Sequence, residues 1–307
     1  MKLEDIKQFY YQGKYKTLIN YFNSKDFYLG SYQTLINAVD SNNLNDLDDR
    51  IKFIYSILSH LALKKDLPSI DSELSQSHIE LAVIQSYIDY ITNKEKVESL
   101  DKLRDYLIEI ESEDHQYKHL FNVLAATIFW KSGEIEEALS TLNAGQGVKD
   151  VESVALLIQI YISISRLDLA KNEYQHARIW ADDHYLIQLS EAWLGLAGTS
   201  TSTNSSYEQA YYVLEELPDR DEPYNKLLRA IAHGALQHFE EAQVELDSIN
   251  SEDEYSIMNE IVISTHLKNK DTNELISRLS SINPDNILVN DLKRKSAEFD
   301  QLSKQFV

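Results

Sequence analysis

The chain has 307 residues, a formal net charge of −21 at pH 7, eight glycines, four prolines and no cysteine. The lack of cysteine excludes disulfides, thiolate nucleophiles and cysteine-ligated zinc. The acidic charge argues against phosphate binding, because Lys and Arg supply that affinity, and it favours basic or neutral protein partners. With 43% hydrophobic residues and so few glycines and prolines, the composition favours long helices around a continuous core.

The N-terminal third, residues 1–112, is expected to form degenerate repeats. Residues 11–20 and 28–37 are near copies of one Tyr-x-Gly-x-Tyr phrase, 17 residues apart, which indicates two successive helices of related design. Apolar spacing predicts one helix over 48–64 and two more over 77–110, although their repeat register is not evident.

Clearer repeats follow over residues 119–282. A breaker, four residues and then an alanine recur, and the alanines lie 32, 40 and 32 residues apart. Periods near 34 built from two helices are typical of tetratricopeptide (TPR) repeats, in which a small residue lets the two helices of a hairpin cross closely. We assign structural repeat positions to Gly133, Ala138, Ala170, Trp193, Ala210 and Ala242.

Two segments complete the expected organisation. The run at 198–206 is rich in Thr and Ser and has no large apolar residue, so it predicts a disordered loop inserted in a helical hairpin. Residues 285–307 alternate apolar and charged residues, which indicates C-terminal capping helices. The predicted fold is therefore all-α: residues 1–307 form a single TPR-like α-solenoid of antiparallel helix hairpins, with a C-terminal capping helix.

The concave face of such an array is the candidate partner-binding surface. First-helix positions that face away from the neighbouring hairpin include several large apolar residues, which suit a long partner segment because burying them is favourable by about 25 cal/mol per Å². The alternative is that these side chains pack against the opposite wall of a tightly wound array. The residues are Val123, Thr127, Trp130, Gln159, Ile162, Ile187, Glu191, Leu194, Tyr224, Leu227 and Ile231.

Several side chains resemble chemical sites but have a simpler structural interpretation. His115 and His119 have the i, i+4 spacing of metal ligands, yet they fit the solvated start of a repeat helix. His233 falls at a packing position, which favours a core histidine with its hydrogen bonds satisfied. Acidic pairs such as Glu136 and Glu137 lie in the first turn of a second helix, where the helix dipole favours carboxylates. We therefore expect no enzyme, no catalytic residue, no metal and no cofactor.

Beyond the general repeat, an ordered set of phrases resembles the coatomer epsilon subunit family of the COPI vesicle coat. The phrases are Asp5–Tyr15, Arg166–Ala170 with Leu189–Trp193, Gln209–Glu216 and Ser296–Leu302, and they span nearly the whole chain. The duplicated segment at 28–37 and the loop at 198–206 depart from the family pattern.

This resemblance implies a bracelet-like array that binds the C-terminal region of the alpha coat subunit within a hetero-oligomeric coat. It implies a structural role in Golgi-to-ER retrograde and intra-Golgi vesicle transport. It also implies that the protein is peripheral on Golgi and COPI vesicle membranes.

The sequence itself predicts a cytoplasmic protein, because Met1–Asp5 lacks an apolar signal core and no stretch is long enough for a bilayer. We expect neither a nucleic acid nor a small molecule as a partner. The alternative function is a soluble TPR adaptor or scaffold that binds a peptide segment of another complex transiently.

The substitution Trp130→Asp tests the concave-face assignment. A charge placed in an apolar groove should abolish binding of the alpha subunit segment in size-exclusion chromatography, while circular dichroism stays helical. Unfolding of the variant would instead show that Trp130 belongs to the core.

Overall fold

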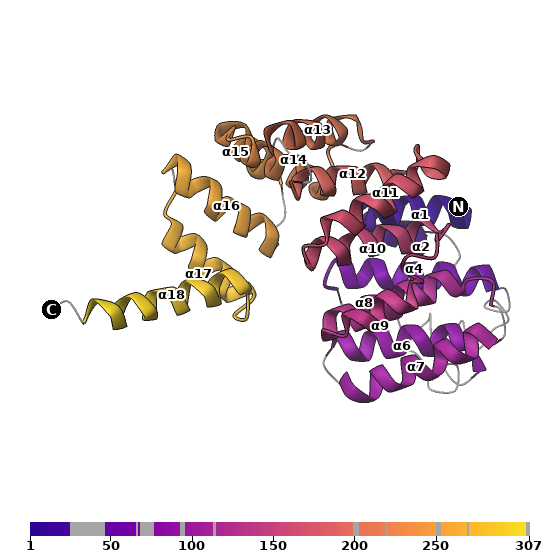
Figure 1. The fold of residues 1–307 in the computed structure, drawn as a ribbon. Coiled ribbons are helices and arrows are strands. Elements are labelled where there is room, and N and C mark those ends of the chain that lie inside the picture. The colour runs from indigo at the N-terminus through magenta and orange to yellow at the C-terminus, as the bar shows by residue number, and fades with distance from the viewer. Residues whose placement is uncertain are drawn as a thin grey trace. The chain divides into compact units, whose positions relative to one another are not determined.

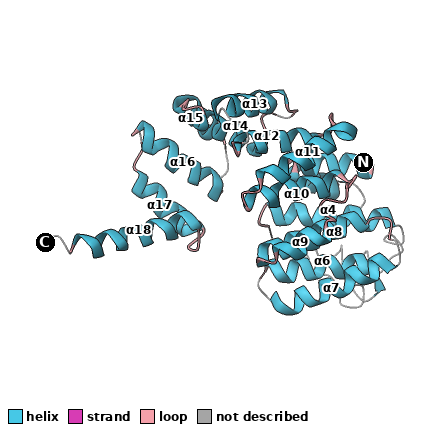
Figure 2. Cartoon of the chain, in the orientation of Figure 1, coloured by secondary structure: helices cyan, strands magenta, loops and turns pink. Residues whose placement is uncertain are grey.

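The computed structural model describes residues 1–24, 47–65, 67, 77–92, 96–112, 115–198, 203–218, 220–249, 253–268 and 270–304. These residues form sixteen helices and no strand, which confirms the predicted all-α class (Figures 1 and 2). The chain divides into two compact units, residues 1–197 (unit 1) and 198–307 (unit 2). No helix in the described part of the chain is long and apolar enough to cross a membrane.

Unit 1 contains ten described helices that share one core. Its regular part is a row of hairpins, α6–α7, α8–α9 and α10–α11, whose first helices pack on one another and then on α12. The N-terminal helices α1, α2 and α4 pack together, and α4 also contacts α6. The helices are α1 (Leu3–Tyr11), α2 (Tyr15–Ser24), α4 (Leu47–Ala62), α6 (Ile79–Ile91), α7 (Lys96–Ser112), α8 (Lys118–Ser132), α9 (Ile135–Thr141), α10 (Val151–Ser163), α11 (Leu167–Ala181) and α12 (Tyr185–Leu196).

Unit 2 contains six described helices, and two smaller cores lie among five of them in the part that the structure describes. One core lies among the helices α14, α15 and α16, and includes Ala242 and Ile263; the other lies among α16, α17 and α18 and includes Leu279 and Val289. The helices are α13 (Thr203–Glu216), α14 (Pro223–Ala235), α15 (Phe239–Asp247), α16 (Glu254–Leu267), α17 (Thr272–Ile282) and α18 (Ile287–Ser303).

The breaker of the repeated phrase has a definite backbone role. Gly133 (φ 91°), Ser165 (φ 59°) and Gln237 (φ 65°) all adopt the left-handed conformation at the turn between the two helices of a hairpin. At the first turn, the amide of Glu134 donates to the carbonyl oxygen of Phe129 at 2.8 Å, so a carbonyl at the end of α8 keeps a partner. The turn thus tolerates a non-glycine residue in two hairpins out of these three.

The third copy of the phrase, which begins at Ser205, differs, and the predicted loop at 198–206 is wrong over residues 203–206. Residues 203–206 form the first turn of α13, so Ser205 is helical and Ser206 is buried. Ser, Thr and Asn are favourable at a helix start, because their short polar side chains bond the free amides there. Residues 199–202 and the copy at 28–37 lie outside the described residues.

Each alanine of the repeated phrase is fully buried in a second helix or in α13. Ala138 lies in α9, Ala170 in α11, Ala210 in α13 and Ala242 in α15, all at 0% exposure. Ala138 and Ala170 belong to the core of unit 1 and Ala242 to a core of unit 2, together with side chains of their first helices. A larger side chain at these points would force the paired helices apart.

We expect Ala170→Leu to lower the free energy of unfolding by about 1–3 kcal/mol, because extra methylenes in a packed core displace its neighbours. Urea denaturation followed by circular dichroism measures the change. Lys171→Leu, at an exposed neighbouring position of α11, is the matched control and should stay within about 0.5 kcal/mol of wild type. Equal effects of the two variants would contradict a close crossing at Ala170.

Candidate partner-binding surfaces

The predicted concave residues of unit 1 are mostly engaged within unit 1. Ile187 and Leu194 are buried in its core, so they are packing positions and not open surface. Val123, Trp130 and Ile162 are partly buried against the same core. Because Trp130 packs there, its replacement by Asp would affect packing as well as any binding.

The polar positions of this set are also used internally. Glu191 accepts a hydrogen bond of 2.6 Å from the Tyr174 hydroxyl of α11, and the Thr127 hydroxyl donates to the carbonyl oxygen of Val123 at 2.7 Å. The indole nitrogen of Trp130 donates to the Ser163 hydroxyl at 3.1 Å. Gln159 is half-buried. At these positions the polar side chains of unit 1 therefore make contacts within the unit.

The N-terminal helices contribute to this covering. Arg50 of α4 donates to Glu80 of α6 at 3.0 Å, and the Tyr117 hydroxyl, just before α8, donates to Asp48 of α4. Further along α4, the Tyr55 hydroxyl donates to Glu152 of α10 at 3.1 Å. One helix thus contacts the starts of three successive first helices.

Glu152 is the centre of the most connected of these polar clusters. Its Oε1 accepts hydrogen bonds from the hydroxyls of Tyr55 and Tyr11 and lies 3.3 Å from the Lys7 ammonium nitrogen. Burial, followed by the neighbouring Tyr55 phenol and then the charge of Glu152, raises the pKa of Tyr11 well above its usual value, and burial likewise raises the pKa of Tyr55. Both phenols therefore stay protonated and act as donors, which fits a structural link among α1, α4 and α10.

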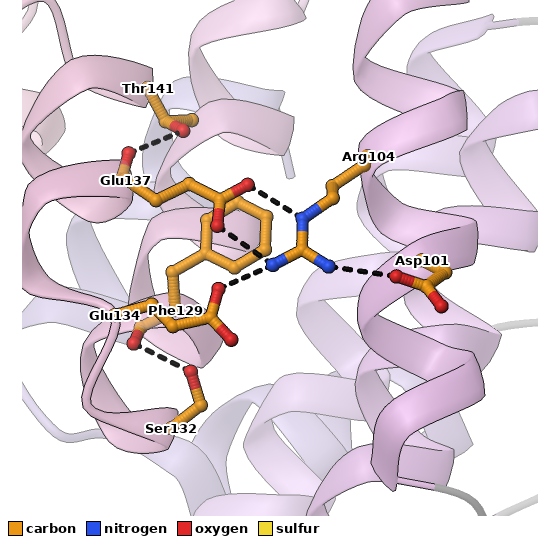
Figure 3. Close-up of polar contacts among 7 residues, drawn as sticks. All are labelled: Asp101, Arg104, Phe129, Ser132, Glu134, Glu137 and Thr141. Carbon is orange, nitrogen blue, oxygen red and sulfur yellow. Dashed lines mark hydrogen bonds and ion pairs between the residues drawn. The ribbon is translucent and has the colours of Figure 1, made fainter.

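A second cluster joins the hairpins α6–α7 and α8–α9 (Figure 3). Arg104 of α7 forms a two-pronged pair with Glu137 of α9, at 2.7 and 2.8 Å, and also bonds Glu134 and Asp101. The hydrogen bond from Arg104 lowers the pKa of Glu137 to about 2, whereas the hydrogen bond shared with Glu137 raises the pKa of Glu134. The acidic first turn of α9 therefore has a specific cation in addition to the helix dipole.

A buried arginine links three helices of unit 2, α13, α14 and α15. Arg229 of α14 is only 3% exposed, and its guanidinium makes two 3.0 Å hydrogen bonds to Glu245 of α15. It also donates to the carbonyl oxygen of Arg220 at 2.9 Å and lies 3.5 Å from Glu215 of α13. These contacts explain how a charged residue can occupy a buried position of α14.

Neither of the histidine sites considered from the sequence shows a set of metal ligands. His115 Nε2 lies 3.3 Å from Glu80 Oε1, and no three His, Cys, Asp or Glu side chains among the described residues group as metal ligands. His233 differs from the prediction of a satisfied core histidine, because its buried Nδ1 has no hydrogen-bond partner in the described part of the chain. Its burial lowers its pKa, which favours the neutral imidazole beside the Tyr211 ring, 4.8 Å away.

Apolar side chains line an open cavity in unit 2. A cavity of about 570 Å³ runs between α14 and α16, with Phe239 of α15 at its side. Ile231, one of the predicted concave residues, lines it; Leu227 is buried in the adjacent core and Tyr224 is exposed. We call this cavity the α14–α16 groove, and it is lined by Ala230, Ile231, Gly234, Ala235, Gln237, Phe239, Asn259, Val262, Ile263 and His266.

The groove walls combine exposed apolar atoms with fixed aromatic rings. Val262 is 50% exposed although it is aliphatic, and the His266 ring stacks on Phe239 with centroids 4.2 Å apart. A β-carbon added at Gly234 would lie 3.1 Å from Ile263, so glycine here permits close approach of α14 and α16. Sequence reasoning missed the α16 and α15 side of this groove, because the repeated phrase is degraded after Ala242.

The family assignment rests on a match over most of the chain. Residues 21–307 match the family model of the coatomer epsilon subunit. The chain belongs to the coatomer epsilon subunit family. Members of this family are structural subunits of the COPI coat, which is a hetero-oligomeric complex. The family is not an enzyme family.

Individual relatives agree with the epsilon subunit assignment. Coatomer subunit epsilon-2 of Arabidopsis thaliana is 26% identical over 308 residues, which cover 98% of this chain and 94% of that protein. Coatomer subunit epsilon of Dictyostelium discoideum is 28% identical over 192 residues, covering 61% of this chain and 59% of that protein. Among solved structures, pilF of Pseudomonas aeruginosa superposes with a TM-score of 0.44 at 15% identity, over 70% of this chain and 96% of that one.

The low pKa of Glu137 predicts a pH-dependent contribution to stability. A carboxyl whose pKa is depressed in the folded state stabilises the fold above its unfolded pKa, about 4.3, and loses this effect as the pH falls towards about 2. The gap in unfolding free energy between wild type and Glu137→Gln should therefore be constant above about pH 5 and narrow below it.

Urea titrations from pH 7 to pH 3 measure this gap. Glu136→Gln, at an exposed position of the same helical turn, is the control and should follow the wild-type profile. A gap for Glu137→Gln that does not change with pH would contradict an ion pair with Arg104.

Proposed function

We propose that this chain is the epsilon-type subunit of a COPI coat and that it binds the C-terminal region of the alpha coat subunit through the α14–α16 groove. In this role it would support Golgi-to-ER retrograde and intra-Golgi transport, acting in the cytoplasm on Golgi and COPI vesicle membranes through the coat. The family match over residues 21–307 carries the proposal.

The choice of groove follows from which of the predicted concave positions unit 1 and unit 2 leave uncovered. In unit 1, Ile187 and Leu194 are buried, and the other predicted positions are partly buried or bonded within the unit. In unit 2, Ile231 and Val262 line an open cavity, and Val262 is half exposed. Removing such surface from water favours binding by about 25 cal/mol per Å², so the open groove has more to gain from a partner.

The chemistry of the groove also indicates the kind of segment it would take. Its lining is apolar apart from Gln237, Asn259 and His266. Charged clamps that hold the carboxylate of a C-terminal peptide are absent from this lining. The groove therefore suits an internal stretch of the alpha subunit with large apolar side chains, and a long-lived complex whose affinity depends little on salt.

Co-expression with the C-terminal segment of the alpha coat subunit tests this proposal. We expect a single peak in size-exclusion chromatography, and we expect Val262→Glu to weaken binding at least about tenfold, because the complex would bury an unpaired carboxylate. Val244→Glu is the matched control, since Val244 is 69% exposed on α15 and does not line the groove.

Two separate peaks for the wild-type chain at micromolar concentration would refute the alpha-subunit partner. Equal losses for both valine variants would refute the groove. Binding that falls steeply with salt would favour a transient adaptor, the alternative function, over an obligate subunit.

A further inference from the structure

The C-terminal helix α18 is almost entirely uncovered. Only Val289 is buried, and every residue from 290 to 302 is exposed. The exposed residues include large apolar side chains, with Phe299 at 71% and Leu302 at 55% exposure. A terminal capping helix should present a polar outer face, so these side chains are anomalous for a cap.

The position of α18 in the repeat explains the anomaly. The helix begins at Ile287, 33 residues after α16 begins at Glu254, so it has the place of a first helix in the next hairpin. In the preceding hairpins a second helix packs along the first, as α15 does on α14 and α17 on α16. Within the described residues no such helix covers α18 beyond Val289.

The uncovered side chains form a regular seam. Consecutive seam residues are spaced by four, three, four and three positions, the heptad pattern by which two helices pack side by side. The α18 seam begins at Leu288, which also packs against the core that contains Val289, and continues with the exposed residues Leu292, Lys295, Phe299 and Leu302. A helix of this length is only marginally stable alone in water, so a partner along the seam would stabilise it.

We propose that α18 is a docking helix for an amphipathic helix of another protein of the coat, which packs along α18 as a second helix packs along the first in the preceding hairpins. The seam sets the chemistry of this partner. Its facing side should be apolar at the ends and carry a carboxylate that reaches Lys295. The 3.4 Å ion pair that Lys295 makes with Glu298 is exposed, so it is worth little and is readily exchanged for a partner carboxylate.

The same seam disfavours a second copy of this chain. Two parallel copies of α18 would place Lys295 against its equivalent in the seam. Two antiparallel copies would bring the flanks that carry Asp291 and Glu298 face to face, since like flanks meet in that arrangement. Like charges meet in both cases, which favours a different polypeptide. This surface is distinct from the α14–α16 groove, because none of its residues lines that groove.

Site-specific photo-crosslinking in the coat complex, purified through a tag on the full chain, tests the proposal. A benzoylphenylalanine in place of Phe299 should crosslink to one segment of another coat subunit, identified by mass spectrometry as an amphipathic helix with an acidic residue in its apolar face. The same probe in place of Gln301, on the opposite side of α18, should crosslink at most one tenth as well.

Each other crosslinking result overturns the proposal. A crosslink to a second copy of this chain, equal yields at the two positions, or no crosslink at position 299 would each do so. Crosslinking at 299 can fail while the alpha subunit still binds the groove, and it can succeed when Val262→Glu has no effect. The two proposals therefore fail independently.

Substitutions in the seam give a second measurement. Phe299→Glu should weaken the crosslinked contact, measured with the identified segment as a peptide, at least about tenfold relative to Gln301→Glu. Lys295→Leu should make the seam wholly apolar and shift the free chain from monomer towards dimer in light scattering. An unchanged affinity for Phe299→Glu, with α18 still helical by hydrogen exchange, would refute the seam.

Discussion

Each first helix of the hairpins carries more apolar surface than its second helix can cover, and the rest of the structure depends on where that surplus is buried. α10 shows the surplus most clearly, because Val154, Leu156, Leu157 and Ile158 are consecutive or nearly so and all are buried. Successive residues point to all sides of a helix, so a run of this kind needs neighbours all round. In unit 1 the neighbours are α8, α11 and α12, with side chains of α1 and α4 at the start of the helix.

Polar groups then fix how the covering helices lie. Glu80 and Glu152 stand at the starts of α6 and α10, and both have little exposure. A buried carboxylate is costly unless donors reach it, and here the donors come from α1 and α4. A shift of α4 by one turn would separate Arg50 from Glu80 and Tyr55 from Glu152, so apolar packing supplies the driving force and these pairs set the register.

Much of this architecture could be predicted from the sequence because it is local or periodic. The repeated phrase places the turns at Gly133, Ser165 and Gln237 and the buried alanines five residues later, since one hairpin contains both features. The Arg104–Glu137 pair joins residues 33 apart, which is about one repeat period. The repeat spacing alone therefore predicts that these two positions lie on neighbouring hairpins. Ser205 broke the pattern because a helix start, which favours the same small polar residues, replaced the turn.

The concave surface was less predictable, because what covers it comes from outside the repeat. The pair between Tyr55 and Glu152 spans 97 residues and has no periodic signal. Ile187 and Leu194 stand at repeat positions that predict an open face, but unit 1 buries both, and no periodic feature of the sequence indicates this burial. In unit 2 Ile231 lines an open groove, and its role in partner binding stays a prediction.

The two units thus share one hairpin design but differ in how much of their apolar surface is buried, and this difference has a functional consequence. Unit 1 has a single core that gathers most of its first-helix apolar residues, so substitutions there act chiefly through stability. Unit 2 has two small cores, a groove and a helix whose apolar seam is bare. An obligate coat subunit needs both properties: a part that folds without help and apolar surface that only its partner covers. The uneven burial along this chain therefore supports the proposal that recognition lies in its C-terminal third, where the repeated phrase is weakest and sequence patterns alone are least informative.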